Sequence, residues 1–274
     1  VRAVRWRILL SRTRALPAPV WDLFRLEAIG LAVNNVLLLR LGELARAGLA
    51  ARRLGIPAVA ALASVAIERA LDVAALLTIF ALAARLAPGI VPVAVVRAAL
   101  ALLAGAIGAL IVLAAAEGSL APGGAVERAL RPWPKLHRFI EQLALGAAVL
   151  RSPAAAAQAA ALSLGLWTVD ALLYWTAARA LGLGELMDYP RAILTLSWAG
   201  AVSAIPAAPG SIGTFEAFVA SILHTFGAGP EIALAYALMT HMIMYLLVTV
   251  TGLVFLSREG VSLACPPFSS AVET

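Results

Sequence analysis

Long apolar runs separated by short polar segments dominate the chain. Five of them approach or exceed the ~20 residues that a helix needs to cross a bilayer, and they cover residues 57–84, 93–116, 154–181, 190–207 and 231–257. Because backbone groups in lipid must form their hydrogen bonds within the segment, such runs predict transmembrane helices. The expected fold is therefore all-α, a polytopic membrane bundle of helices.

Two further apolar segments are interrupted by polar residues, glycine or proline. Residues 21–50 contain two asparagines and several charges, and residues 209–226 begin with Pro-Gly-Ser-Ile-Gly. Irregular backbone at membrane depth is tolerated only where it is buried in protein or lines a cavity, so both segments are expected to be broken or re-entrant helices. Two such segments in opposite halves of a chain favour a transport site between internal repeats, although no residue-level repeat is evident.

The remaining segments are polar. Residues 1–20 alternate arginine with tryptophan, isoleucine and leucine, which predicts an amphipathic helix on the membrane surface. One transmembrane domain is expected over residues 1–257, followed by a disordered tail at 258–274. The loop 117–152, with a predicted surface helix at 135–150, is rich in basic residues, and this places the loop and the N-terminus in the cytoplasm.

Composition supports a membrane protein. Of the 274 residues, 62% are hydrophobic and 13% are charged, whereas soluble domains carry ~25% charged residues. The net charge of +6 is assigned to cytoplasmic arginines near anionic lipid rather than to nucleic-acid binding. Abundant arginine and alanine indicate a bacterial source, and hence the bacterial inner membrane. The single cysteine, Cys265, excludes a disulfide within one chain and a cysteine-based metal site.

Glu68, Arg69 and Asp72 lie near the middle of the apolar run at 57–84. A charge at the bilayer centre costs roughly 2.5–3.5 kcal/mol on insertion scales, so these side chains must face protein, water or a polar ligand. On a helix, Glu68 and Asp72 share a face, and Arg69 neighbours Asp72. Two interpretations are open. The charges form an ion-pair network that holds helices together, or they form the polar wall of a cavity in which Arg69 binds phosphate or carboxylate.

A second charged group recurs every three residues, so that Arg40, Glu43 and Arg46 lie along one helical face. A guanidinium group suits a lipid phosphate. Asn34 and Asn35 lie just upstream and need hydrogen-bond partners in an apolar setting. The alternative is a cytoplasmic helix end anchored among lipid headgroups.

The third group surrounds a predicted helix start. Pro209, Gly210 and Gly213 break the preceding helix, and the free N–H groups of the next one could bind an anion. The alternative is that Glu216 caps this helix itself. Elsewhere in the chain, Asp170 is expected to pair with Arg69 or Arg40, or to be protonatable.

The sequence carries little sign of catalysis. His-Glu-x-x-His, a histidine–carboxylate cluster and a nucleophile elbow are all missing from it. Glu68 and Asp72 could hold Mg²⁺ through their carboxylates, but the adjacent Arg69 opposes divalent binding. His241 could relay protons or be a hydrogen-bonded interior histidine. We expect no cofactor, no metal and no enzymatic activity.

Three stretches carry a family resemblance: VNNVLLLRLGELARAGL (33–49), ASVAIERALD (63–72) and PAAPGSIGTFEAFVASIL (206–223). They resemble signatures of the lysylphosphatidylglycerol synthase transmembrane-region family, also called flippase-like, across about residues 5–257. The resemblance implies an all-helical bundle, and the best-understood family members move an aminoacylated phospholipid between leaflets. By matching position, the residues that would line or shape the path are Asn35, Arg40, Glu43, Arg46, Glu68, Arg69, Asp72, Pro209, Gly210, Gly213 and Glu216.

The chain departs from the family pattern in two ways. Leu38 stands where the family usually has proline, so a softer break before Arg40 is expected. Family members also tend to have further transmembrane helices ahead of the stretch found here at residues 5–10, so a truncated or shorter form is expected. The 274 residues hold no counterpart of the soluble aminoacyl-transfer domain of the bifunctional synthases, and lysyl transfer is not expected.

The expected function is to bind a lipid with a polar headgroup, either a phospholipid or a polyprenyl-linked lipid, and to flip it across the membrane. Arg40, Arg46 and Arg69 would hold anionic groups, while the carboxylates would counter them or hold a cationic headgroup. A homo-oligomer is compatible with the sequence. One alternative is a membrane enzyme, or its partner, in polyprenyl-linked or hopanoid lipid or glycan biosynthesis. Another is a structural or regulatory protein whose charges only hold helices.

Overall fold

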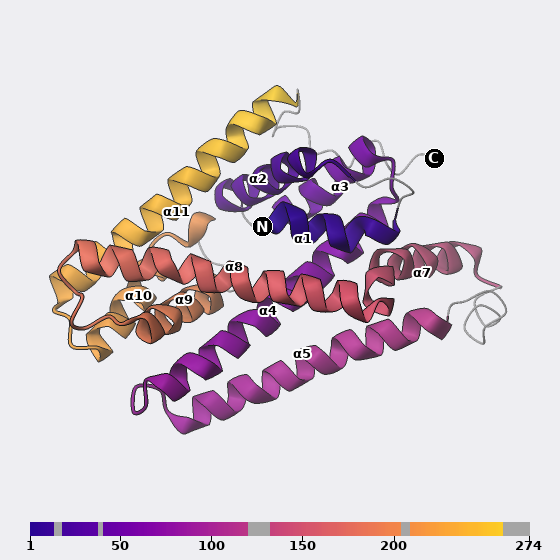
Figure 1. The fold of residues 1–274 in the computed structure, drawn as a ribbon. Helices are drawn as coiled ribbons and strands as arrows, with labels where there is room; N and C mark the ends of the chain where they lie inside the picture. Colours follow the sequence, from indigo (N-terminus) through magenta and orange to yellow (C-terminus); the bar gives the residue numbers. More distant parts are fainter. Residues whose placement is uncertain (14–17, 38–40, 120–131, 204–208, 260–274) are drawn as a thin grey trace.

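The computed structural model describes residues 1–13, 18–37, 41–119, 132–203 and 209–259. Within these ranges the secondary structure is exclusively helical (Figure 1). The all-α fold predicted from the apolar runs is therefore confirmed.

Four long helices run the length of the molecule: α4 (Ala58–Leu86), α5 (Val93–Ser119), α8 (Pro153–Ala180) and α11 (Pro230–Arg258). With 27 to 29 residues each, they extend for about 40 Å, which exceeds the ~30 Å hydrocarbon thickness of a bilayer. Among the described residues, three helices are apolar enough to be candidate spans: α8, α11 and the Val93–Ala114 part of α5. Helix α4 is as long but carries the three central charges.

Two short helices form the first hairpin, α2 (Val20–Val36) and α3 (Gly42–Leu54). Asp22 near the start of α2 lies 3.0 Å from the Arg53 guanidinium near the end of α3, so the two helices are antiparallel. A Cβ atom at Gly42 would overlap the carbonyl oxygen of Gly30, so glycine allows the two limbs to approach closely. The helix break expected within 21–50 is present, and Arg40 itself lies outside the described residues.

The second hairpin consists of α9 (Tyr189–Ser203), the short 3-10 helix η4 (Pro209–Ser211) and α10 (Thr214–Thr225). Arg191, near the start of α9, lies over the ring of Phe226, which directly follows α10. The two limbs are therefore antiparallel. With 15 and 12 residues, the limbs extend for about 22 and 18 Å. The run at 190–207, expected to be a full span, is described only as far as Ser203, where α9 forms one limb of the hairpin; residues 204–208 lie outside the described part.

The turn ends of the two hairpins meet beside α11. Gly210 has a positive φ of 63°, and a Cβ atom there would overlap the ring of Tyr245 and lie 3.4 Å from the backbone oxygen of Asn35. The Asn35 amide donates a hydrogen bond of 2.9 Å to the Thr249 hydroxyl. The two interrupted segments, far apart in sequence, are thus neighbours in the fold.

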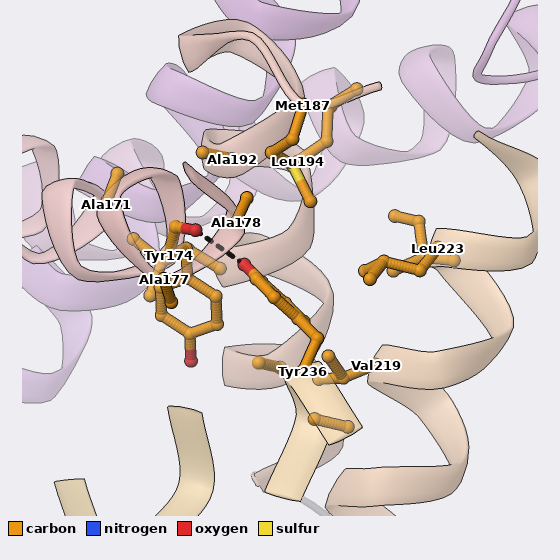
Figure 2. Close-up of a cluster of buried hydrophobic side chains, with 14 of the residues drawn as sticks. Ala171, Tyr174, Ala177, Ala178, Met187, Ala192, Leu194, Val219, Leu223 and Tyr236 are labelled. Atoms are coloured by element: carbon orange, nitrogen blue, oxygen red, sulfur yellow. Dashed lines mark hydrogen bonds between the residues drawn. The ribbon is translucent and has the colours of Figure 1, made fainter. Parts of the chain in front are cut away.

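Two apolar cores fill the molecule, one around each hairpin, and α4, α8 and α11 contribute to both. The core around the second hairpin includes Leu194, Val219 and Leu223 (Figure 2). Within it, the buried Tyr236 hydroxyl on α11 donates a hydrogen bond of 2.8 Å to the carbonyl oxygen of Tyr174 on α8. The long helices therefore hold the two hairpins at opposite ends of one body (Figure 1).

Helix α1 (Arg2–Leu9), continued by the 3-10 helix η1 (Leu10–Arg12), packs inside the core around the first hairpin. Arg5, Trp6 and Leu9 are fully buried. The expectation of a surface helix at residues 1–20 is therefore wrong for this part. Its tryptophan and leucines belong to the apolar core, and Arg5 finds carboxylates there.

A true surface helix is α7 (Pro134–Ala147), which η3 (Ala148–Arg151) follows. It packs on α4 through Gly146, while Trp133, Leu136 and Phe139 are exposed. The C-terminal end of α11 lies at the same end of the molecule. There Glu259 pairs with Arg53 of α3 at 2.5 Å and with Arg25 of α2 at 2.9 Å. The tail expected to be disordered lies outside the described residues from position 260 onwards.

Candidate functional site

A buried ion-pair network connects helices from both ends of the sequence. At its centre is Glu68 on α4, whose carboxylate lies 3.0 Å from the Arg5 guanidinium and 3.2 Å from that of Arg46. Glu68 and Arg5 are fully buried, and Arg46 is 2% exposed. The central carboxylate of the apolar run is therefore enclosed by two guanidinium groups, one from α1 and one from α3.

Asp72, one turn further along α4, is held in the same way. Its carboxylate pairs with Arg5 and accepts a hydrogen bond of 3.0 Å from the indole N–H of Trp167 on α8. Arg5 also donates a hydrogen bond of 2.6 Å to the Ser163 hydroxyl on α8. The predicted shared face of Glu68 and Asp72 is confirmed, because both carboxylates contact one arginine.

Trp6 completes the packing around the arginines. The Arg46 guanidinium lies over its ring, 4.5 Å from the centroid, and the indole N–H donates a hydrogen bond of 3.0 Å to Ser64 on α4. A guanidinium over an aromatic face is stabilised by the ring quadrupole. We call Arg5, Arg46, Glu68, Asp72 and Glu27 the inner network.

Four further charges form the outer edge of this network and are partly exposed. Arg69 lies 3.0 Å from Glu43 on α3 and 3.3 Å from Asp72, with 32% and 29% of the Arg69 and Glu43 side chains exposed. On the α1–α8 side, Arg2 lies 3.6 Å from Asp170. We call Arg2, Glu43, Arg69 and Asp170 the rim of the network. The inner network is thus enclosed, whereas the rim can be reached from two sides.

Glu27 on α2 is the least satisfied member of the network. Its Oε1 lies 2.6 Å from the Arg46 guanidinium, but neither carboxylate oxygen has a well-aligned hydrogen bond among the described residues. The side chain is 3% exposed. An unsatisfied buried carboxylate is costly, and Glu27 lines a crevice beside the network.

That crevice lies between the first hairpin and α4. It has an empty volume of about 170 Å³ and admits no water-sized sphere. It is closed to a lipid headgroup in this conformation. The residues that line it are Glu27, Gly30, Leu31, Asn34, Gly42, Glu43, Arg46 and Arg69.

The structure brings five of the predicted site residues into this network: Glu43, Arg46, Glu68, Arg69 and Asp72. The burial of Arg46 excludes the headgroup-anchored helix end for this residue. Arg40, predicted alongside them, lies outside the described residues.

Asp170 also belongs to the network, but its ion-pair partner among the described residues is Arg2. The expected pairing of Asp170 with Arg69 is not found, because Arg69 binds Glu43 and Asp72 instead. Helix α1 places an arginine between α4 and α8, which the sequence did not indicate.

The third predicted group lies apart from the network, at the second hairpin. Oε2 of Glu216 accepts a hydrogen bond of 2.7 Å from the backbone N–H of Gly213. The alternative interpretation, a carboxylate that caps its own helix, is therefore confirmed. Its other oxygen lies 2.6 Å from His241 on α11. Pro209 and Gly210 form the adjacent turn.

Several network members escaped the sequence reasoning. Arg2, Arg5 and Trp6 were assigned to the membrane surface because arginine alternates with apolar residues there. Glu27 was overlooked, although it is a lone carboxylate in the apolar stretch Leu26–Val33. That isolation is the signal that could have identified it, because a lone charge in an apolar helix needs a partner.

Comparison with known proteins identifies one family. The family model described as "Lysylphosphatidylglycerol synthase TM region" matches residues 1–252. A search of curated proteins and a search of solved structures each found no significant match.

Proposed function

Because the chain belongs to the lysylphosphatidylglycerol synthase transmembrane-region family, we propose that it binds a membrane lipid by its polar headgroup and moves that headgroup between leaflets. The family supports a membrane protein of lipid-related function. The movement of lipid, the class of headgroup and the bacterial inner membrane are parts of the proposal. The basic end with Arg25, Arg53 and α7 is placed in the cytoplasm.

The observation that carries the proposal is the partly exposed rim of a buried charge network. Glu68 and Asp72 are paired with the buried guanidinium groups of the inner network, whereas Glu27, beside the crevice, has no well-aligned hydrogen bond among the described residues. Arg69 and Glu43, which line the crevice, keep about a third of their side chains exposed. Charges at membrane depth are expensive, and two helices exposing opposite charges at one place offer a binding site for a polar group.

Each rim residue has a chemical role in this proposal. Arg69 presents a planar guanidinium that can bind a phosphate with two hydrogen bonds. Glu43 and Asp170 carry the charge that would attract an ammonium group. A headgroup would therefore replace the Arg69–Glu43 pair, while the acyl chains stay in the surrounding lipid.

Opening the crevice requires the first hairpin to move away from α4. The close contact between Gly30 and Gly42 makes the hairpin a compact unit. The Arg46–Glu68 and Arg69–Glu43 pairs are the bonds that such a movement would break. A charged headgroup could compensate for part of this loss, which gives the lipid a means of favouring the open state.

The inner network favours a second role for its own members, namely to hold helices together. Arg5, Glu68 and Asp72 join α1 to α4, and Trp167 adds α8. In this proposal the inner network is the scaffold and the rim binds lipid. No chemical change of the lipid is assigned to any residue.

A transport assay with a matched pair of variants tests the proposal. Arg69 and Arg191 both have side chains that are 32% exposed and pair with an aspartate three residues away. Arg191 lies on α9, away from the network. The protein is reconstituted into liposomes with fluorescently labelled phosphatidylglycerol or phosphatidylethanolamine, and the movement of lipid between leaflets is followed with a membrane-impermeant quencher.

Arg69→Gln is expected to slow lipid movement about tenfold, which corresponds to ~1.4 kcal/mol, while Arg191→Gln keeps the native rate. The labelled lipid should be recovered chemically unchanged. Equal rates for the two variants, with equal thermal stability, would contradict a role of the rim in transport. Turnover of the lipid by the pure protein would favour an enzyme instead.

A further inference from the structure

A carboxylate–imidazole pair, separate from the network, connects the second hairpin to α11. Nδ1 of His241 on α11 lies 2.6 Å from Oε1 of Glu216 at the start of α10. The two side chains are each 8% exposed. The other Glu216 oxygen accepts the backbone N–H of Gly213, so the carboxylate connects the turn of the hairpin to α11.

The groups around this pair are aromatic or neutral. Phe215 stacks on the His241 ring with 4.3 Å between centroids, and Tyr245 meets it edge-on at 5.9 Å. On α8, the Tyr174 carbonyl accepts a hydrogen bond from Tyr236 of α11, while Asp170 pairs with Arg2 and Arg179 lies over the Trp175 ring.

The charged groups on the elements packed around the pair have partners elsewhere. On α9, Arg191 pairs with Asp188. On α2, Asp22, Arg25 and Glu27 pair with Arg53, Glu259 and Arg46. On α10, His224 binds the carbonyl of Ala228. Within the described residues, no guanidinium pairs with Glu216.

We propose that Glu216 and His241 form a proton-binding site, and that its proton is coupled to the movement of lipid. With one proton shared between the two side chains, the pair is neutral overall. When that proton leaves, one net negative charge remains among aromatic side chains, where a charge is poorly solvated. Loss of the proton therefore weakens the contact between α10 and α11, whereas the Gly213 cap can persist.

The location of the pair makes this change relevant to the hairpins. Tyr245, which meets the His241 ring, also lies against Gly210 in the turn of the second hairpin, and Gly210 lies beside Asn35 of the first. A weaker α10–α11 contact would loosen the place where the two turns meet. The proton site stands on its own geometry, while its coupling to lipid movement rests on the proposed function.

Nuclear magnetic resonance tests the site directly. The chain has three histidines, so a His137→Gln and His224→Gln double variant, labelled with ¹⁵N-histidine, reports on His241 alone. A change of pH should convert the imidazole nitrogens between the protonated and neutral forms, and Glu216→Gln should move the midpoint of this change. A His241 that keeps one protonation state throughout, or a midpoint that Glu216→Gln leaves unchanged, would overturn the assignment.

The coupling is tested by the pH dependence of lipid movement in the liposome assay. The native rate should change with pH by up to about tenfold per unit, the limit for one linked proton. His241→Gln should flatten this dependence, and the matched control His224→Gln should retain it. A native-like profile in His241→Gln would overturn the coupling but leave the transport function standing. A native protein that moves no lipid at any pH would overturn transport and coupling together, and the resonance titration would still decide the proton site.

Discussion

The two hairpins have the same design but are held by different interactions. Each consists of two antiparallel limbs with at most 17 described residues, fewer than the ~20 needed to cross a bilayer, and the turn ends of the two hairpins meet beside α11. The first hairpin is fixed to α4 by buried ion pairs, such as Arg46 with Glu68. The second is fixed by apolar packing, by the Glu216–His241 contact and by a hydrogen bond from the Tyr189 hydroxyl to the Thr168 carbonyl on α8.

This difference in interactions indicates which hairpin can respond to a charged ligand. A buried ion pair is retained only while each charge has its partner, and breaking one is strongly destabilising. A headgroup that offers alternative charged partners can therefore compete with the ion pairs that hold the first hairpin to α4. The apolar contacts of the second offer no such exchange, and only a change in its protonation alters its charge. We therefore assign lipid binding to the first hairpin and proton linkage to the second.

The largest expected effect comes from breaking the centre of the network. Glu68→Gln leaves Arg5 and Arg46 with one charged partner fewer in a fully buried site, and we expect a loss of 3–5 kcal/mol, about the cost of breaking a buried pair. The measurement is the free energy of unfolding in detergent. Asp188→Asn, which breaks the exposed pair with Arg191, serves as the control and should cost less than ~1 kcal/mol. Similar costs for the two variants would show that the inner network does not hold the first hairpin.

A smaller effect is expected from forcing the first hairpin apart without changing any charge. In Gly42→Ala the new methyl group would overlap the Gly30 carbonyl, and we expect a cost of about 1–3 kcal/mol from overpacking. Gly48→Ala on the same helix meets nothing within 4 Å and should stabilise by ~0.5–1 kcal/mol through helix propensity. Thermal unfolding of both variants checks the close approach of the limbs, and a stabilising Gly42→Ala would contradict it.

The core around the second hairpin should respond to the loss of one hydrogen bond. Tyr236→Phe removes the donor to the Tyr174 carbonyl (Figure 2), and a cost of about 1 kcal/mol is expected. Both partners are buried, so the loss should not depend on salt concentration. A marked salt dependence in chemical unfolding would indicate that charges, rather than apolar packing, dominate this core.

The smallest effect belongs to the exposed end of the first hairpin. Arg53→Gln removes contacts with Asp22 and Glu259, but partly exposed pairs contribute only ~0–1 kcal/mol. The loss should shrink further as salt is added, because exposed charges are screened. Unfolding at low and high ionic strength checks this, and a large loss unaffected by salt would contradict the contrast between the buried and exposed charges.

Much of the fold could be predicted from the sequence. Long apolar runs gave the four long helices, because hydrophobicity and length suffice to identify a membrane span. The interruptions by Asn34 and Asn35 and by Pro209 and Gly210 located both hairpin turns. The last part of the apolar run at 190–207 lies outside the described residues, so the predicted full length of that helix stays a prediction.

The candidate site could be predicted only in part. The spacing of Glu68 and Asp72 correctly placed both on one face, because that relation is local to a helix. The partners of these residues come from α1, α2 and α8, and such pairings depend on three-dimensional packing. An arginine beside a tryptophan, as in Arg5-Trp6, has the same local pattern on a membrane surface and in a buried core.

The central claim is that the rim of the network holds a polar headgroup, and the lipid retained by the purified protein tests it most directly. Native protein, Arg69→Gln and Arg191→Gln are purified under identical conditions, and bound lipid is identified and quantified by mass spectrometry. The account predicts one class of polar lipid retained by the native protein and by Arg191→Gln, and lost from Arg69→Gln. Equal retention in all three proteins, or no retained polar lipid in any, would contradict it.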